Sequence, residues 1–191
     1  MSDVLTIDTS AGVIKEEKVE LLPLFSDNLP MLSEKIPEYT STLPNPQMTK
    51  LVQQLKLTMS QYAGLGLAAN QCGIFQRVFV IGTDQFQIAC INPKIISASE
   101  EIEKQGEGCL SFPALSLKIG RPKSVNVEYT TENGEIKQVT LDGLTARCFQ
   151  HELDHLNGIK FTNHVGETSM MLARQKQAKM MKKFRKYEKN K

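Results

Sequence analysis

The chain has 191 residues, of which 40% are hydrophobic, and a formal net charge of +2. This length supports one compact domain with its own core, so neither disulfides nor a tandem architecture is required. The four cysteines form no Cys-x-x-Cys pair, and no apolar run approaches the ~20 residues that would span a bilayer. With no recognisable signal or transit peptide, we expect a cytoplasmic protein with reduced thiols.

The N-terminal third predicts little regular structure before one helix. Residues 1–20 show no clear period and predict a strand or a loose arm. Five prolines between residues 23 and 46 then predict an extended, turn-rich segment. Apolar residues spaced by three and four from Met48 to Tyr62 predict an amphipathic helix that ends at Gly64.

Strand patterns dominate the middle of the chain. Residues 77–81 and 87–91 predict two strands, and Asn92-Pro93 is expected to stop the second. Apolar and polar residues alternate over 125–129, and Asn133-Gly134 supplies a tight turn before residues 136–141. That combination predicts a β-hairpin.

A second helix is expected from about Leu144 to Asn157, with Gly158 as its stop. It carries His151 and His155, which lie four residues apart and so leave the same helical face, where a divalent metal can be held between them. Glu152 can accept a proton from water at that metal. We therefore expect an α+β domain, with antiparallel or mixed β-sheets packed around a central metal-binding helix. On the short motif alone, a hydrogen-bonded pair of core histidines is the alternative.

A catalytic metal usually needs a third protein ligand. A zincin-like peptidase would take it from downstream, but Phe161 occupies the position of the metzincin histidine, and Glu167 and Glu188 lie near or within the basic tail. Upstream, Cys109 lies in the irregular segment Gly106–Pro113. A Cys-His-His set would suit zinc or ferrous iron and leave one position free, although a single cysteine is more commonly a small buried thiol.

Three segments together resemble a known family. Gly64-Leu-Gly-Leu-Ala-Ala-Asn-Gln71, Glu107-Gly-Cys-Leu-Ser111 and Gln150-His-Glu-Leu-Asp-His-Leu-Asn-Gly158 are similar to the three signature motifs of the peptide deformylases, in the same order and at similar spacing. The resemblance extends from about Leu22 to Gly166. It implies a catalytic domain over residues 1–168, with residues 1–20 as an arm, followed by a basic helix over 169–191.

The resemblance also implies a reaction. It suggests a metal-dependent hydrolase that removes the formyl group from the N-terminal formyl-methionine of newly made polypeptides and releases formate. Glu152 would be the general acid and base, while the Gln71 side chain and the Leu110 backbone N–H would bind the oxyanion. One divalent metal per chain is implied, with Fe²⁺ the physiological ion and Zn²⁺, Ni²⁺ or Co²⁺ as substitutes. The implied metal ligands are Cys109, His151 and His155.

By the same resemblance, the extended peptide would pair with main-chain groups around Leu65, Gly66 and Gly108, where glycines let a backbone approach. An apolar pocket should receive the methionine side chain, and the positions that match its walls include Leu65, Leu144, Arg147 and Cys148. Arg147 and the neighbouring Gln105 are polar where many relatives are hydrophobic. Many relatives also carry an arginine near the position of Ser116, where it assists substrate binding.

Acidic residues near the motifs leave their roles open. Glu107 and Asp154 could orient a ligand histidine or fix a loop, and surface or structural roles are equally compatible with the sequence. Gln71 could instead be a loop amide that satisfies backbone groups. His164 lies beyond the motif and is expected at the surface.

The basic end of the chain predicts a third helix, from Ser169 to about Tyr187. Residues 174–191 hold nine Lys or Arg against one acid, a local charge of +8, so the other 173 residues carry −6. An apolar stripe favours an amphipathic helix packed on the body; it consists of Met170, Ala173, Met180, Phe184 and Tyr187. The alternative is docking on ribosomal RNA near the exit of nascent chains.

Three classes of function are compatible with these patterns. The first is a deformylase acting on formyl-methionyl peptides. The second is another HExxH metal hydrolase, such as a zincin-like peptidase, and the third is a non-catalytic ribosome- or RNA-binding protein with a structural metal. Glu152 argues against the third class, because a structural site needs no base beside its ligand. No membrane or DNA partner is expected.

Overall fold

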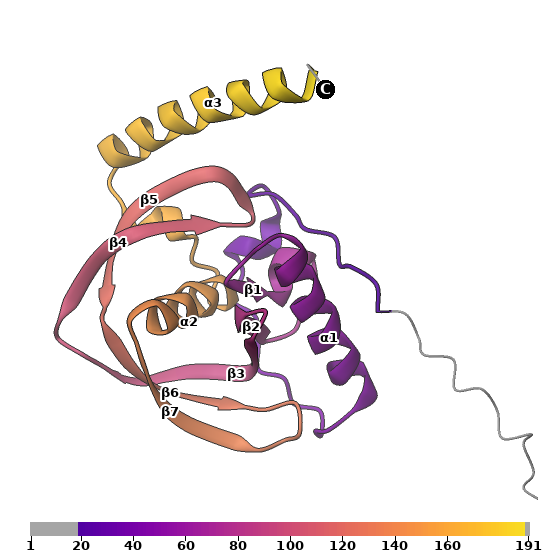
Figure 1. The fold of residues 1–191 in the computed structure, drawn as a ribbon. Coiled ribbons are helices and arrows are strands. Elements are labelled where there is room, and N and C mark those ends of the chain that lie inside the picture. Colours follow the sequence, from indigo (N-terminus) through magenta and orange to yellow (C-terminus); the bar gives the residue numbers. More distant parts are fainter. Residues whose placement is uncertain (1–18, 190–191) are drawn as a thin grey trace, which may run out of the picture.

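The computed structural model describes residues 19–189 (Figure 1). The arm predicted for residues 1–20 therefore lies almost wholly outside the described residues. In chain order the elements are η1 Pro30–Ser33, α1 Pro46–Gln61, β1 Gly66–Ala68, η2 Ala69–Cys72, β2 Val78–Thr83, β3 Phe86–Ala98, β4 Ile102–Cys109, β5 Phe112–Pro122, β6 Ser124–Thr130, β7 Ile136–Asp142, α2 Gly143–Leu156, η3 Phe161–His164 and α3 Glu167–Lys189.

The strands form two antiparallel sheets. The five-stranded sheet has the order β1-β2-β3-β6-β7, and the second sheet consists of β4 and β5. Helix α2 lies between the two sheets, where it contacts strands of both, and α1 packs against β1 and β2 at the side (Figure 1). The predicted α+β class, with antiparallel sheets around a central helix, is confirmed.

Strand β3 differs from its prediction. Asn92-Pro93 was expected to stop the strand near Ile91, but β3 continues to Ala98 and shifts its register with β6 between Ile91 and Lys94. Asn92 has a φ of 50°, a left-handed conformation that asparagine tolerates better than most residues. The resulting bulge accommodates a proline that cannot donate to the ladder. The strand therefore bends at this point and goes on.

The other predicted elements occur with shifts at their ends. Helix α1 ends at Gln61 rather than at Gly64, because Ala63 already takes a left-handed φ of 51°. Helix α2 is confirmed within one residue at each end, and Gly158 follows it with a φ of 72°. The β6–β7 hairpin is confirmed around Gly134, which has a φ of 86°. Helix α3 begins at Glu167, two residues before the predicted N-cap.

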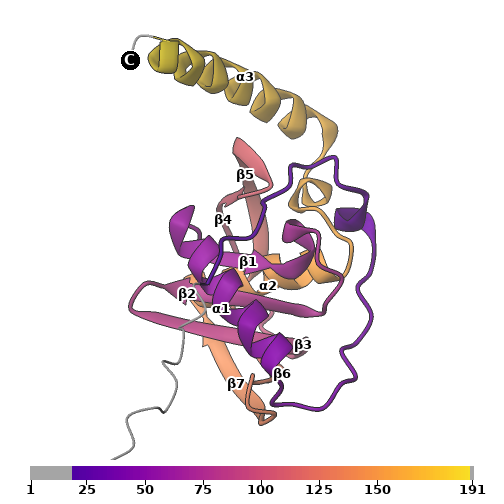
Figure 2. The same ribbon diagram turned by 90° about the vertical axis from the view of Figure 1, so that its right-hand side faces the viewer.

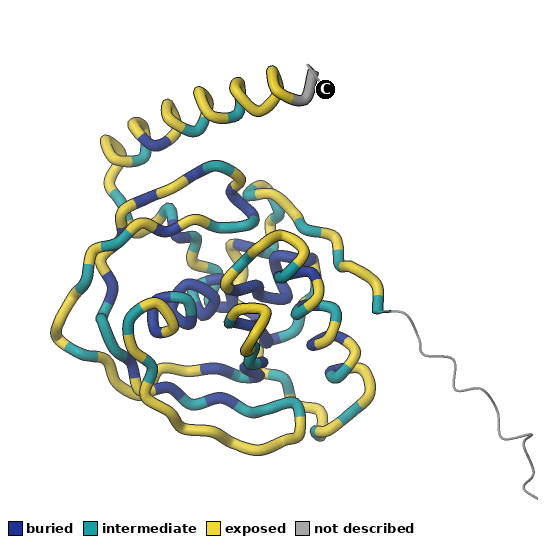
Figure 3. Tube along the Cα trace, in the orientation of Figure 1, coloured by how far each residue is buried: buried dark blue, intermediate teal, exposed yellow. Residues whose placement is uncertain are grey.

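Buried side chains gather around α2 (Figure 3). Phe149 of α2 packs edge-on against Phe79 of β2, with ring centroids 5.0 Å apart. On the face towards the second sheet, Phe161 packs against Phe112 of β5 in the same manner. Burying large aromatic rings on both sides of one helix contributes several kcal/mol in total, at about 2–3 kcal/mol per ring. The core thus fixes the helix that carries the histidine motif.

Polar side chains also hold the C-terminal end of α2. The Arg77 guanidinium donates to Leu156 O at 3.2 Å and to Ile36 O at 3.1 Å. Asn70 Nδ2 donates to His155 O at 2.6 Å. Carbonyl groups in the last turn of a helix have no partner within it. Here the Ile36 N–H also donates to Leu156 O and the Gly158 N–H to His155 O, so Arg77 and Asn70 add second donors to carbonyls that the backbone already pairs.

Helix α3 packs on the body only through its first turns. Ala173 is buried against β5, with Met170 beside it. Farther along, Met180, Phe184 and Tyr187 are 48%, 57% and 63% exposed. Figure 2 shows the rest of the helix extending past β5, away from the sheets. The prediction of a helix packed along its apolar stripe is therefore right for the first turns and wrong for the remainder. None of the helices within residues 19–189 is both long and apolar enough to cross a bilayer.

Candidate metal centre and active site

Three predicted ligands come together between α2 and the end of β4. The ligand atoms of Cys109, His151 and His155 all lie within 4.8 Å of one another, and Cys109 Sγ is 3.2 Å from His155 Nε2. One thiol and two imidazoles form a donor set that suits zinc or ferrous iron and leaves a coordination position free. These side chains therefore fit a single divalent cation.

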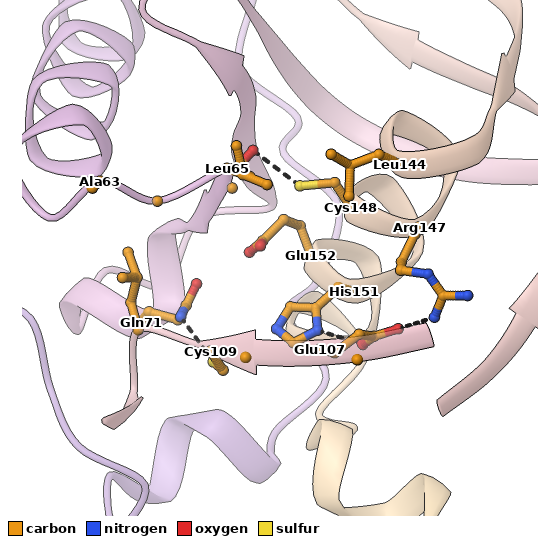
Figure 4. A pocket seen from close by; sticks show the side chains of 15 residues that line it. Ala63, Leu65, Gln71, Glu107, Cys109, Leu144, Arg147, Cys148, His151 and Glu152 are labelled. Carbon is orange, nitrogen blue, oxygen red and sulfur yellow. Dashed lines mark hydrogen bonds and ion pairs between the residues drawn. The ribbon is translucent and has the colours of Figure 1, made fainter. Parts of the chain in front are cut away.

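A buried carboxylate orients the first histidine (Figure 4). Glu107 Oε2 lies 3.0 Å from His151 Nδ1. Arg121 donates to both oxygens of Glu107, from Nε at 2.6 Å and from Nη2 at 3.0 Å. Arg147 adds a third arginine bond, from Nη1 to Glu107 Oε1 at 2.7 Å. With Nδ1 occupied by Glu107, His151 Nε2 is the nitrogen left for a cation.

The pKa values of the two ligand histidines are shifted in opposite directions. Burial alone would lower the pKa of His151, but its hydrogen bonds with Cys109 and Glu107 outweigh burial and raise the pKa to about 10. Burial, with the positive charges of His151 and Arg121, holds the pKa of His155 well below its ordinary value. His155 therefore stays neutral and keeps a lone pair for a cation, whereas a cation at His151 Nε2 must displace a proton.

Glu152 faces the same space from α2. Its side chain is 4% exposed, and Oε2 is buried with no hydrogen-bond partner among residues 19–189. Burial raises the pKa of Glu152 to about 7, against the opposing effect of His151 and Arg121. Gly66 makes room for this carboxylate, because a Cβ there would overlap Glu152 Oε1. A carboxyl group of this kind can take up and release a proton near neutral pH.

Gln71 lies on the opposite wall. Its Oε1 accepts a hydrogen bond from the Ala68 N–H at 2.8 Å, which directs Nε2 towards Cys109 Sγ at 3.5 Å and Ser111 Oγ at 3.3 Å. Leu110 follows in the turn between β4 and β5. The Gln71 amide does satisfy a backbone group, as the structural alternative required, and it also presents a donor beside the metal ligands.

One cavity of about 240 Å³ is lined by Gln71, Glu107, Cys109, Leu110, His151 and Glu152. Figure 4 shows Glu152 and His151 projecting into it from α2, with Gln71 and Cys109 facing them. Its wall also contains all six residues predicted to bind substrate, namely Leu65, Gly66, Gly108, Leu144, Arg147 and Cys148. Gln105 lies on β4 without lining the cavity. Cys148 Sγ donates to Leu65 O at 2.9 Å, which ties α2 to the segment before β1.

The comparisons with known proteins agree with this geometry. Residues 21–170 match the family described as Polypeptide deformylase. The peptide deformylase of Thermotoga petrophila is 41% identical over 129 residues, which are 68% of this chain and 79% of that protein. The chain belongs to the peptide deformylase family. The peptide deformylase of Prochlorococcus marinus is 38% identical over 158 residues, which are 80% of this chain and 78% of that protein.

Solved structures of other deformylases show the same fold. The crystal structure of the Thermotoga maritima peptide deformylase has a TM-score of 0.74 and 36% identity, and the match covers 77% of this chain and 99% of that one. The peptide deformylase of Synechococcus elongatus, in complex with actinonin, has a TM-score of 0.77 and 34% identity, with 82% and 88% covered. Peptide deformylases are hydrolases that remove the N-terminal formyl group, and this chain is one of them. Neither alternative class is favoured.

Two groups at this deformylase site were not predicted from the sequence. Arg121 braces Glu107 and also donates to Asp154 Oδ2 at 2.8 Å. The sequence feature that could have indicated Arg121 is the pattern of β5. Leu115, Leu117 and Ile119 are buried at alternate positions, and Arg121 occupies the next position of that alternation. Ser111 belongs to the second of the three motifs, but no role was predicted for it. Its hydroxyl accepts a hydrogen bond from Gln71 Nε2.

The open roles of the neighbouring residues can now be described. Glu107 contacts a ligand histidine directly, whereas Asp154 contacts Arg121 and, at 2.8 Å, His164 Nε2. His164 is exposed, as predicted. Ser116 lies opposite Gly108 in the β4–β5 ladder. Arg147 lines the cavity as a charged residue, and its guanidinium is paired with the Glu107 carboxylate.

Proposed function

We propose that this deformylase hydrolyses the formyl group of N-formyl-methionyl peptides with a divalent metal held by Cys109, His151 and His155. One observation supports this most strongly: Glu152 Oε2, which is buried without a hydrogen-bond partner among residues 19–189, belongs to a side chain that lines the same cavity as Cys109 and His151 of that Cys-His-His set. A buried acceptor without a partner is costly, and it is kept where a reacting group or water will meet it.

When bound, a divalent cation in such a set acidifies a water ligand and polarises a carbonyl group. Glu152 takes the proton from the attacking water at its carboxylate and passes it to the amine as the C–N bond breaks, so formate and a free N-terminus result. Gln71 Nε2 and the Leu110 N–H donate to the formyl oxygen as it gains negative charge. The bond from the Ala68 N–H to Gln71 Oε1 supports the first of these roles, because it holds the Gln71 amide in place.

The peptide is held by main-chain groups on two sides of the cavity. Strand β1 is an edge strand, paired only with β2 within the described residues, so the segment with Leu65 and Gly66 has a free side for an extended peptide. Gly108 faces it from the end of β4, where a Cβ would meet nothing nearer than 3.8 Å. Leu144 and Cys148 of α2, with Leu65, enclose the first side chain.

The physiological ion proposed is Fe²⁺, with Zn²⁺, Ni²⁺ or Co²⁺ as substitutes, because a thiolate with two imidazoles accepts all four. Metal content of protein purified under anaerobic conditions tests this. One equivalent of iron per chain, lost on exposure to air together with activity, is expected. Equal turnover with zinc before and after exposure to air would contradict the preference for iron.

The reaction itself is tested by formate release from formyl-Met-Ala-Ser. Glu152→Ala should lower kcat by about 10²–10⁴ while one metal ion stays bound, because general acid–base catalysis contributes that much. Cys109→Ala should lose the metal. The matched control is Glu101→Ala, since Glu101 is exposed, forms an ion pair with the exposed Lys123 and does not line the cavity. Cleavage of unblocked peptides at comparable rates would instead support a peptidase.

We also propose a role for the basic helix in a cytoplasmic enzyme that meets its substrate on the ribosome. Residues 1–168 would be the catalytic domain and 169–191 an appended contact, with ribosomal RNA as the polyanion. The exposed outer turns of α3 support this, with lysines at 176, 179 and 183 around the apolar residues. Deleting residues 178–191 keeps the buried Ala173 and the Gln177 bond to Pro113 O. The deletion should abolish ribosome co-sedimentation and leave turnover of formyl-Met-Ala-Ser intact; unchanged sedimentation overturns the proposal.

A further inference from the structure

One wall of the active-site cavity carries a buried guanidinium. Arg147 lies four residues before the ligand His151 on α2, about 6 Å along the helix axis, and its side chain is 6% exposed. Three bonds hold it: Nη1 donates to Glu107 Oε1 at 2.7 Å and to Ile119 O at 3.0 Å, and Nη2 donates to Glu103 O at 2.6 Å. Swinging the side chain out of the cavity wall would break all three.

Arg147 also keeps an unused donor. Its three bonds employ only Nη1 and Nη2, so Nε has no hydrogen-bond partner among residues 19–189. Only three side-chain atoms of those residues are both fully buried and unpartnered, and they are Asn70 Oδ1, Glu152 Oε2 and His155 Nδ1. Arg147 Nε is not one of them, so it remains reachable by solvent, and Arg147 is one of the residues that line the cavity.

Glu107 cannot satisfy this donor. Its Oε1 already accepts from Arg121 Nε and Arg147 Nη1, and its Oε2 from Arg121 Nη2 and His151. A carboxylate has about four acceptor positions, and all four are used. The ion pair of Arg147 with Glu107 carries no net charge, but the Nε–H group of Arg147 still lacks an acceptor within the described part of the chain. A ligand that fills the cavity with hydrocarbon alone would bury this donor unpaired, which weakens binding.

Apolar side chains also line the cavity beside Arg147. Leu144 lies three residues before it on α2, Leu65 lines the cavity from the segment before β1, and the Cys148 thiol donates to Leu65 O. An acidic side chain is disfavoured here, because the carboxylates of Glu107 and Glu152 line the same cavity. The pocket therefore matches a long, uncharged side chain that carries one strong acceptor near its end. Thioether sulfur is a weak acceptor, whereas a sulfoxide oxygen on the same chain is polar and accepts well.

We propose that Arg147 sets the side-chain specificity of this enzyme, so that it deformylates peptides whose first residue is methionine sulfoxide at least as well as those with an apolar isostere. The proposal rests on the deformylase function above. The reaction is unchanged: water adds to the formyl carbon, the C–N bond breaks, the proton reaches the amine, and the sulfoxide is neither reduced nor consumed.

The test compares two substrates on the metal-loaded enzyme: formyl-methionine sulfoxide-Ala-Ser and formyl-norleucine-Ala-Ser. We expect the wild-type ratio of kcat/KM, sulfoxide over norleucine, to be one or more. Arg147→Leu should lower this ratio about tenfold or more. A site built to hydrogen-bond one substrate rejects the analogue that lacks the hydrogen-bonding group. When the donor is removed, that preference is lost. Affinities of the two deformylated product peptides, measured by calorimetry, should show the same order.

Arg121→Leu is the matched control. Arg121 braces the same Glu107 but does not line the cavity, so its loss should slow both substrates equally and leave the ratio unchanged. The proposal is overturned if the wild-type enzyme prefers norleucine, with a ratio below one, or if Arg121→Leu shifts the ratio as far as Arg147→Leu does. The wild-type ratio decides the matter even if Arg147→Leu does not fold. Failure to release formate from formyl-Met-Ala-Ser would refute the function itself, a separate result.

Discussion

Glu107 Oε2 and His151 Nδ1 lie 3.0 Å apart, and both are buried. Arg121 supports this contact by binding both oxygens of Glu107 and then reaching Asp154. These charge-assisted bonds, with burial opposing them, lower the pKa of Glu107 to about 2, so it is a carboxylate throughout the physiological range. One residue of the second sheet thus fixes how a ligand on the central helix is oriented.

Glu107→Gln should weaken metal binding. The amide carries no charge and holds the His151 ring less firmly, and loss of such a partner typically costs about 10- to 100-fold in metal affinity. Competition with a chelator of known affinity measures the change. Glu101→Gln is the control, because Glu101 is exposed and lies just before β4, at the opposite end of that strand from the ligand Cys109. Equal affinity in wild type and Glu107→Gln would show that the contact does not position the ligand.

Gly66→Ala should inactivate the enzyme with little change in metal content. A Cβ at this position would overlap Glu152 Oε1, so the carboxylate must turn away from the cavity. We expect kcat to fall by about 10² or more, as for loss of the general base itself. Formate release and metal analysis on the same preparation check this.

The control for this substitution is Gly166→Ala, since no atom lies within 4 Å of the Cβ built there. Wild-type turnover in Gly66→Ala would mean that Glu152 has room the structure does not show. Loss of metal together with turnover would point to a general disturbance of α2.

Arg77→Met should destabilise the fold without touching the cavity. The guanidinium donates to four acceptors, including Leu156 O at the end of α2 and Asn157 Oδ1 just after it. Leaving several buried acceptors unpaired, at about 1–3 kcal/mol each, should lower the free energy of unfolding by at least about 3 kcal/mol. Urea denaturation of the chelated protein measures it. Lys94→Met, at an exposed ion pair on β3, should change it by less than about 1 kcal/mol.

Local sequence patterns predicted the elements that depend on local chemistry. The spacing of His151 and His155 gave the face of α2, and Asn133-Gly134 gave the hairpin, because both depend on near neighbours in the chain. The strand through Asn92 was missed, since its continuation depends on pairing with β6 and on a bulge. Arg121 was missed for a similar reason: its partners, Glu107 and Asp154, lie 14 and 33 residues away.

The metal ligands also depend on contacts between residues that are far apart in the sequence. Cys109 and His155 are 46 residues apart, and no periodicity relates a strand end to a helix face. Only the resemblance to a family linked them before the fold did. The apolar stripe predicted the packing of the first turns of α3 but not the exposure of its outer turns, because amphipathicity states that a face is apolar and not what covers it.

Removal of the metal should expose one thiol selectively. Cys109 is half-buried and lines the cavity, and a bound cation would occupy its sulfur. Burial raises the pKa of Cys72 to about 12 and holds the pKa values of Cys90 and Cys148 well above the ordinary range. Those three therefore remain unreactive thiols at pH 8, since only the thiolate is a good nucleophile.

Iodoacetamide at pH 8 should accordingly label Cys109 in chelated protein and spare all four cysteines in metal-loaded protein. Raising the pH to 9 should not recruit Cys72, because that pH is still far below its pKa of about 12. Peptide mass mapping identifies the labelled residue, and Cys109→Ser should take up no label when chelated. Labelling of Cys148 ahead of Cys109, or equal labelling of Cys109 with and without metal, would contradict its role as a ligand.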